Sequence, residues 1–375
     1  MSSGRIIITF YGDFVASHPN EIEFSNDIDS LISSSDVNVV NFEAPIETNE
    51  KALMKSGPSL FQSKDSPCFL ENKGFNVVSM ANNHIFDYNL AGCEQSVSSF
   101  KKASVIGVGN WDEAYKVRIK VINNIRVGFI ALCHREFMVL DDSSDTTQKY
   151  GCAWVNHHLA LDRVREARRD CDYLFVYPHA GVEDIDVPIP EWRNVYRQFI
   201  DAGADAVVAS HPHIIQGCEC YKGRFIYYSL GNFFFERENM PSHWKKGLCV
   251  SFTIQDGTIS PSLFFVRKDG MKLTHDVDEL ANFNKLNALL GNSPEYEKRL
   301  NDYVRKLMPM YLYYYKLSLN GLPNDKRDLK MILRCIKSWL RGKHSYLLLL
   351  NMIRCESHRW LFMRGLNLMI YNNCK

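Results

Sequence analysis

The sequence predicts an α/β protein, a sandwich of two mixed β-sheets flanked by helices, with a C-terminal helical appendage. Short β-branched and aromatic runs alternate with helical patterns up to about Ser229, and this alternation is typical of a largely parallel sheet. Two hairpin turns, at Asn123–Asn124 and Asp256–Gly257, add antiparallel strand pairs. After about Arg267 the strand signals give way to helical patterns.

The predicted strands are short apolar runs bounded by turn residues. They cover Arg5–Tyr11, Val37–Phe42, Asn76–Met80, Ser104–Val108, Tyr173–Tyr177, Ala206–Ala209 and Phe225–Ser229. The predicted helices cover Phe24–Ser34, Leu90–Ala103, His157–Asp170 and Glu191–Ala202. The last of these helices follows Pro190 and precedes Gly203, residues that favour the start and the end of a helix.

The length of 375 residues predicts two structural units, because single cores stop growing beyond about 250 to 300 residues. We expect an α/β domain over residues 1–268 and a basic, mainly helical region over residues 269–375. Within the latter, residues 326–364 carry ten basic and two acidic side chains, which predicts a basic amphipathic helix pair. Such a pair packs on the core with a solvated basic face, or docks on a membrane surface or an acidic partner.

The composition argues against nucleic acid as a partner and indicates a cytoplasmic protein. Lys and Arg number 44 against 43 Asp and Glu, so the chain has no general attraction to polyanions. Its eleven Cys include no CxxC pair, which fits reduced thiols better than disulfides. The first apolar run ends at Gly12 and is too short for a signal peptide, and no run approaches the ~20 residues of a membrane span. Contact with the inner membrane face through the basic region stays open.

Side chains of the kinds that bind metal ions follow successive predicted strands. They are Asp13, Glu43, Asn83, His179, His211 and His213. Because the carboxyl ends of parallel strands share one edge of a sheet, these residues are expected to converge on one site. Each also has a structural reading when taken alone: Asp13 suits a turn or helix cap, Asn83 a turn, and His179 a hydrogen-bonded loop. Their joint placement favours a metal centre.

Four segments of the chain resemble the CapA family, whose domain belongs to the calcineurin-like metallophosphoesterase superfamily. They read YGDF, NFEAPI, GFNVVSMANNHIFDY and AGADAVVASHPHIIQGCECYKGRFIYYSLGNFFF. A fifth segment, PHAGVED, has Ala180 where the family usually has Trp, and Asn89 stands where Gly is usual. The resemblance covers about residues 5–266 and implies a role in capsule, poly-γ-glutamate or exopolysaccharide biosynthesis.

The resemblance also implies a ligand set for two divalent metal ions. Asp13 and His213 would hold one ion, Asn83, His179 and His211 the other, and Glu43 would bridge them. The superfamily's further ligand to the first ion is replaced by Val15, so we expect one firm and one weak ion, with Asn41 the nearest spare donor. Oxygen and imidazole ligands suit Mn, Zn or Fe.

By the same resemblance, His84 would protonate the leaving group, and Asp87 would orient the His84 ring by a hydrogen bond. This predicts a metal-dependent hydrolase acting on a phosphoester or a γ-glutamyl substrate, that is, on a phosphorylated or a glutamyl-polymer substrate. The alternative is a non-catalytic metal-binding or scaffold subunit of an envelope-polymer synthesis complex, suggested by Val15 and Ala180. His134 could line a substrate pocket or cap a strand.

Overall fold

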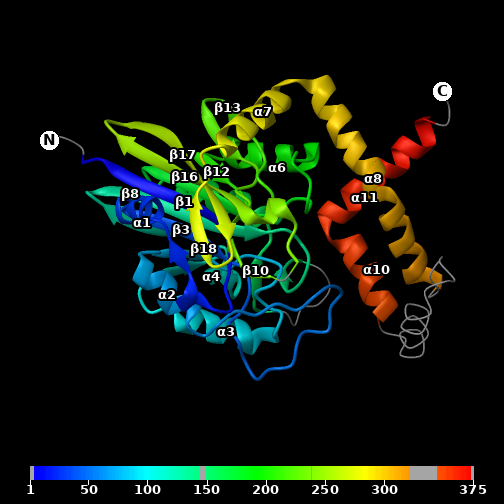
Figure 1. The fold of residues 1–375 in the computed structure, drawn as a ribbon, viewed down its shortest axis with the longest axis horizontal. Coiled ribbons are helices and arrows are strands. Elements are labelled where there is room, and N and C mark those ends of the chain that lie inside the picture. Colours follow the sequence, from blue (N-terminus) through cyan, green and yellow to red (C-terminus); the bar gives the residue numbers. More distant parts are fainter. Residues whose placement is uncertain (1–3, 143–148, 238, 321–343, 373–375) are drawn as a thin grey trace.

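The buried β-branched and aromatic runs assemble into two large β-sheets in the computed structural model of the chain, which describes residues 4–142, 149–237, 239–320 and 344–372 (Figure 1). The first sheet contains, in spatial order, β2 (Glu23–Phe24), β18 (Lys272–His275), β17 (Thr258–Asp269), β16 (Lys246–Gln255), β1 (Ile6–Val15), β3 (Val37–Phe42), β4 (Val77–Ser79) and β5 (Ser104–Ile106), with β15 (Asn232–Phe235) paired to β1. Strands β1, β3, β4 and β5 are parallel, and β16 and β17 are antiparallel. The sheet is therefore mixed.

The second large sheet is also mixed. Its strands are, in order, β13 (Cys218–Tyr221), β14 (Arg224–Tyr227), β12 (Ala206–Val208), β11 (Tyr173–His179), β8 (Ile125–Cys133) and β7 (Arg118–Ile122). The four central strands are parallel and the two edge strands are antiparallel to their neighbours. A small third sheet contains β6 (Val108–Gly109), β10 (Gly151–Ala153) and β9 (Val139–Leu140).

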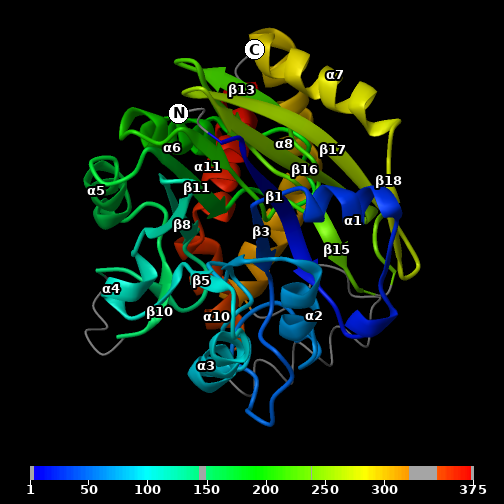
Figure 2. The ribbon, with the colours of Figure 1, turned by 90° about the vertical axis from the view of Figure 1, so that its left-hand side faces the viewer.

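Helices surround the sheets (Figure 2). They are α1 (Asn26–Ser33), α2 (Ser66–Lys73), α3 (Asn89–Ser99), α4 (Trp111–Ala114), α5 (His158–Ala167), α6 (Pro190–Asp201), α7 (Glu279–Gly291), α8 (Ser293–Asn320), α10 (His344–Arg354) and α11 (Glu356–Asn372), with 3-10 turns η1 (Pro19–Glu21) and η2 (Ser242–Lys245). The α/β sandwich, its four predicted helices and both hairpins are confirmed. Helix α2 was not predicted, because its apolar residues stand side by side in the sequence and do not recur at helical spacing.

Aromatic side chains join the two large sheets face to face. Phe10 of β1 lies with its ring centroid 5.3 Å from that of Phe175 and 5.7 Å from that of Tyr177, both on β11. Phe252 of β16 lies 5.2 Å from Phe175. All four residues are buried, and burying side chains of this size contributes about 1.5 to 3 kcal/mol each. This packing holds the carboxyl ends of the parallel strands of both sheets close together.

The C-terminal helices share their core with the second sheet. Leu300 and Val304 of α8 and Leu361 of α11 are buried in the same cluster as Trp192 of α6, and Trp192 Nε1 donates to Ser357 Oγ at 3.0 Å. Figure 1 shows α8, α10 and α11 together beside the sheets. The first sheet continues to His275 through β17 and β18, and the division into domains at residue 268 stays a prediction.

The basic stretch over residues 326–364 is described only from residue 344 onward, in α10 and α11; residues 321–343 lie outside the described residues. In the described part these helices pack on the core. No described helix combines the length and the apolar character that crossing a membrane requires. Membrane contact through the basic stretch remains a prediction.

Glu356 attaches α11 to the α/β core, and its loss should destabilise the protein. Its carboxylate is buried and accepts from the backbone N of Arg135 at 2.8 Å, from Trp154 Nε1 and from Asn156 Nδ2 at 3.0 Å. Glu356→Ala should lower the free energy of unfolding by about 3 kcal/mol, because each buried donor left without an acceptor costs about 1 to 3 kcal/mol. Urea denaturation measures this loss of stability, with Glu295→Ala, which changes an exposed residue, as the control. Equal denaturation midpoints of the two variants would contradict the role of Glu356 in attaching α11.

Candidate metal centre

Both large sheets contribute to one polar site at the carboxyl ends of their parallel strands. Asp13 and Glu43 come from β1 and the end of β3 in the first sheet, and His179 ends β11 in the second. His211 and His213 follow β12. The structure therefore brings together residues that lie some 200 positions apart, as the strand-end pattern predicted.

Asp13 lies inside a strand, which corrects the prediction that it follows one. Strand β1 runs on to Val15 because β15 pairs in parallel with its last residues. The register shifts between Asp13 and Phe14, a β-bulge of the kind that re-aims side chains near functional sites. Gly12, which precedes Asp13, lets the backbone of β1 lie close to that of Gly231. A Cβ at residue 12 would lie 1.9 Å from the carbonyl oxygen of Gly231.

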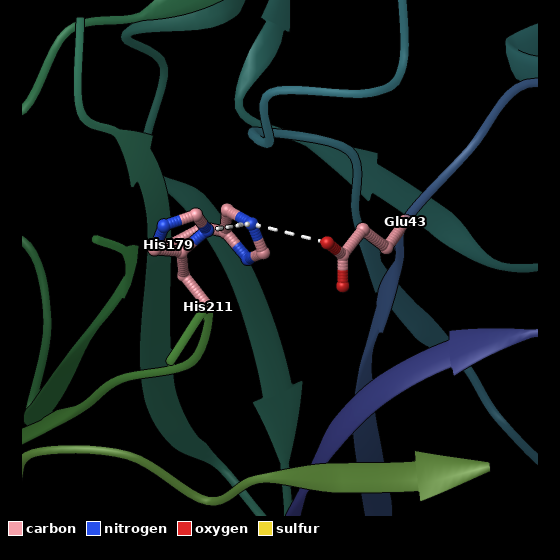
Figure 3. A group of neighbouring side chains, drawn as sticks. All are labelled: Glu43, His179 and His211. Carbon is pink, nitrogen blue, oxygen red and sulfur yellow. Dashed lines mark hydrogen bonds and ion pairs between the residues drawn. The ribbon is translucent and has the colours of Figure 1, made fainter. Parts of the chain in front are cut away.

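Glu43 stands between two groups of possible metal ligands. One group is Glu43, His179 and His211, and the other is Asp13, Glu43 and His213; within each group, one donor atom from each residue lies within 4.8 Å of the others. Glu43 Oε1 is 3.6 Å from His179 Nε2 and 3.5 Å from His213 Nε2. Figure 3 shows the Glu43 carboxylate facing His179, with His211 beside it. This is the division of ligands that the family resemblance implied.

The Glu43 carboxylate is fully buried and neither of its oxygens has a hydrogen-bond partner. A buried ionised carboxylate without donors is costly unless a cation neutralises it. Burial raises the pKa of Glu43 well above its ordinary value, and the nearby charge of Asp13 raises it further. Carboxylate, imidazole and amide oxygen form a donor set that suits divalent transition metals. The residues present therefore fit a cation at this position.

The three histidines are held neutral, which is the form that binds metal. Burial lowers the pKa of His213 to about 4 and that of His211 well below its ordinary value. His213 Nδ1 donates to Asn232 Oδ1 at 2.9 Å, so its Nε2 presents a lone pair toward Glu43. This is the usual way in which a second residue orients a metal-binding histidine, and Asn232 would have this role toward His213.

The His179 ring contacts Asn83, His211 and Ser210. Its Nε2 is 3.0 Å from Asn83 Oδ1 and 3.1 Å from His211 Nδ1, so Asn83 belongs with these two histidines. Its Nδ1 lies 3.0 Å from Ser210 Oγ. Asn41, predicted as a spare ligand, instead orients its neighbours, because its Nδ2 donates to Asp13 Oδ1 at 2.8 Å and its Oδ1 accepts from Asn82.

The two histidines of the SHPH segment have unusual backbone conformations. The φ angles are +101° at His211 and +56° at His213. Non-glycine residues in such regions cost on the order of 1 to 3 kcal/mol each and concentrate at functional sites. The strain is offset by the backbone hydrogen bonds on either side, where Ala209 N donates to the carbonyl oxygen of Tyr227 and Leu230 N donates to the carbonyl oxygen of Ala209.

Val15 provides no ligand, as predicted. Its side chain is buried in an apolar cluster with Ala44, Phe235 and Trp244. The Trp244 ring lies 4.1 Å from that of His213 and 5.3 Å from that of Phe235. Packing against Trp244 therefore restrains the ring of His213.

His84 and Asp87 form a buried pair beside the centre. His84 Nδ1 donates to Asp87 Oδ2 at 2.7 Å, which leaves Nε2 for proton transfer. Lys55 forms an ion pair with Asp87, and its Nζ lies 3.3 Å from His84 Nδ1. The Lys55 side chain is only 2% exposed. Sequence reasoning missed Lys55, because a lysine in an irregular loop gives no signal of burial.

A cavity of about 460 Å³ lies over the centre, and its walls come from both ends of the chain. Asn83, His84, His211 and His213 line it together with residues of the C-terminal helices, namely Leu307, Met310, Tyr311, Tyr314, Leu348, Asn351, Met352, Cys355, Ser357 and His358. His134 also lines it, in agreement with its pocket reading. The helical region thus forms a wall of the site, which no local sequence pattern indicates.

Comparisons with known proteins concern the first two thirds of the chain. The family model of the bacterial capsule synthesis protein PGA_cap matches residues 9–237. The capsule biosynthesis protein CapA of Bacillus anthracis is 27% identical over 242 residues, which are 62% of this chain and 56% of that protein. The PGA biosynthesis protein CapA of Bacillus subtilis is 27% identical over 243 residues, 62% of each chain. The chain thus spans less than two thirds of either relative.

Among solved structures, the 5'-nucleotidase of Candida albicans is matched with a TM-score of 0.43 and 12% identity, over 80% of this chain and 58% of that one. A likeness at this level says nothing about activity or substrate. The family model, in contrast, covers more than half of the chain and includes every predicted ligand. The chain therefore belongs to the bacterial capsule synthesis protein family PGA_cap.

Proposed function

We propose that the chain is a metal-dependent hydrolase that acts on a phosphoester or a γ-glutamyl substrate in capsule or poly-γ-glutamate biosynthesis. The observation that carries the proposal is the buried Glu43 carboxylate, which has no hydrogen-bond donor and stands between two groups of imidazole and carboxylate ligands. The names of the two CapA relatives, which refer to capsule and PGA biosynthesis, support the pathway.

Asp13, Glu43 and His213 would hold one cation, and Glu43, His179, His211 and the Asn83 amide oxygen the other. When bound, two such cations lower the pKa of a water molecule and neutralise charge on the attacked group. Asn41 and Asn232 keep Asp13 and His213 in position through the hydrogen bonds described above. We expect Mn, Zn or Fe at these positions, with the site that includes Asp13 the weaker one.

His84 is the proton donor in this proposal. It lines the cavity, and its Nε2 is the ring nitrogen that Asp87 leaves free. A proton passes from Nε2 to the departing oxygen or nitrogen as its bond to the phosphorus or carbonyl carbon breaks. Asp87 holds the ring and stabilises the imidazolium, and the ion pair with Lys55 fixes Asp87 in turn.

The cavity offers cationic side chains and hydroxyl groups to an anionic substrate. Its volume of about 460 Å³ falls in the range of about 300 to 1,000 Å³ that is typical of ligand sites. Lys55 and Arg237 line it, as do Tyr311 and Tyr314 of α8 and the acidic residues Glu136, Glu183 and Asp184. Cations and aromatic hydroxyls suit phosphate or polyglutamate carboxylates.

Metal removal and return tests the proposal. Protein treated with a chelator should hydrolyse neither p-nitrophenyl phosphate, bis-p-nitrophenyl phosphate nor γ-glutamyl-p-nitroanilide, and Mn or Zn should restore activity on one of them. Such activations by metal typically supply several kcal/mol of barrier lowering, so a restored rate about 10²-fold or more above the chelated protein is expected. Tight metal binding with no hydrolysis of any substrate class would favour the scaffold alternative.

A further inference from the structure

A second cluster of metal-type ligands lies where the α/β core meets the C-terminal helices. It consists of Glu136, three residues beyond the end of β8, and of Cys355 and His358 at the start of α11. One donor atom from each of the three residues lies within 4.8 Å of the others. The cluster shares no residue with the candidate metal centre, and all three residues line the same cavity.

The ligand atoms of this cluster are oriented by their neighbours. His358 Nδ1 is 2.9 Å from the hydroxyl of Tyr311, so its Nε2 is the nitrogen that faces Glu136 Oε1, 4.0 Å away. Asn351 Nδ2 donates to the same Glu136 oxygen at 3.1 Å. Partners of this kind fix the ring and the carboxylate of metal ligands. Separations of about 4 Å are those between ligand atoms that share one cation, given bonds of ~2.0 to 2.3 Å.

A buried histidine, His134, lies beside the cluster. His134 is buried, its Nε2 has no hydrogen-bond partner and lies 3.6 Å from Glu136 Oε2, and its Nδ1 is 4.0 Å from Cys355 Sγ. Cys355 immediately precedes the 17-residue helix α11. Burial raises the pKa of its thiol, and the neighbouring His134 lowers it.

We propose that Glu136, Cys355 and His358 form a zinc site, separate from the first centre, that ties α11 to the α/β core. A thiolate, an imidazole and a carboxylate form a ligand set typical of Zn, and three protein ligands are the number found where zinc keeps a further position for a small ligand. Because Glu136, Cys355 and His358 all line the cavity, an ion held by them would be within reach of an anionic group of a substrate. The proposal goes beyond the proposed hydrolase function and does not depend on it.

Cobalt substitution tests the proposal, because Co²⁺ bound to a thiolate gives an absorption band that other ligands do not give. Neither ligand group around Glu43 contains a cysteine, so a near-ultraviolet thiolate-to-cobalt charge-transfer band must come from elsewhere. Full-length protein titrated with Co²⁺ after chelation should develop this band at about one equivalent per chain, and Zn²⁺ should displace it. Cys355→Ala should abolish the band, whereas Cys152→Ala, which removes a buried thiol beside Asn82, should keep it.

Two further variants separate this site from the first centre and from misfolding. Glu43→Gln should keep the band, whatever happens to hydrolysis. His358→Gln changes a ring whose side chain is 34% exposed, so the fold should survive by circular dichroism while Co²⁺ affinity at this site falls at least about tenfold. A wild-type protein without the band, a band that survives Cys355→Ala, or unchanged affinity in His358→Gln would overturn the proposal.

Discussion

Glu43→Gln is expected to deplete the candidate centre of metal and to abolish hydrolysis. Glu43 is the only residue common to both ligand groups around it, and glutamine keeps its shape while removing the negative charge that two cations require. Metal affinity should fall by more than the about 10- to 100-fold that the loss of an outer partner causes. Metal analysis of dialysed protein, joined to the hydrolysis assay, measures both effects.

The same substitution has an unusual expected effect on the metal-free protein. Because the carboxylate is buried and lacks donors, its replacement by a neutral amide should leave the chelated protein at least as stable as wild type. Added Mn²⁺ should then raise the melting temperature of wild type and not that of Glu43→Gln. The exposed Glu47→Gln, four residues on, is the matched control. Equal metal content in both variants would refute the bridging role of Glu43.

His84→Ala is expected to lower the hydrolysis rate by about 10² to 10⁴-fold, the usual loss when a general acid is removed. Its metal content should match wild type, since His84 is in neither of the two ligand groups of the centre. The loss should be smaller for substrates with good leaving groups such as p-nitrophenolate, because these need less protonation. This is measured by comparing kcat of His84→Ala with that of wild type on a series of substrates whose leaving groups differ in basicity.

A histidine outside the cavity provides the control for this variant. His158→Ala removes a ring that is 65% exposed and should leave kcat unchanged. If His84→Ala lost metal together with activity, His84 would act as a ligand and not as an acid. If it kept full activity on every leaving group, the pair with Asp87 would be structural.

Local sequence was sufficient to predict most of the site, because its residues follow strands that the sequence itself marks. Buried parallel strands such as β3 and β11 are continuous apolar runs, and parallel pairing brings their carboxyl ends to one edge. Glu43 and His179 therefore converge wherever the two sheets pack. The exact end of β1 was not predictable, because it depends on pairing with β15, more than 200 residues later.

The sequence by itself determined the α/β sandwich, the family and the candidate ligands at the strand ends, since hydrophobic period and short motifs are local properties. Only the tertiary structure decided that Lys55 is buried against Asp87, that Asn41 orients Asp13, and that α8, α10 and α11 wall the cavity. It also placed Cys355 and His358 beside Glu136. The reason is physical: contacts between separate segments of the chain depend on how loops and helices pack on the sheets, which no spacing along one segment records.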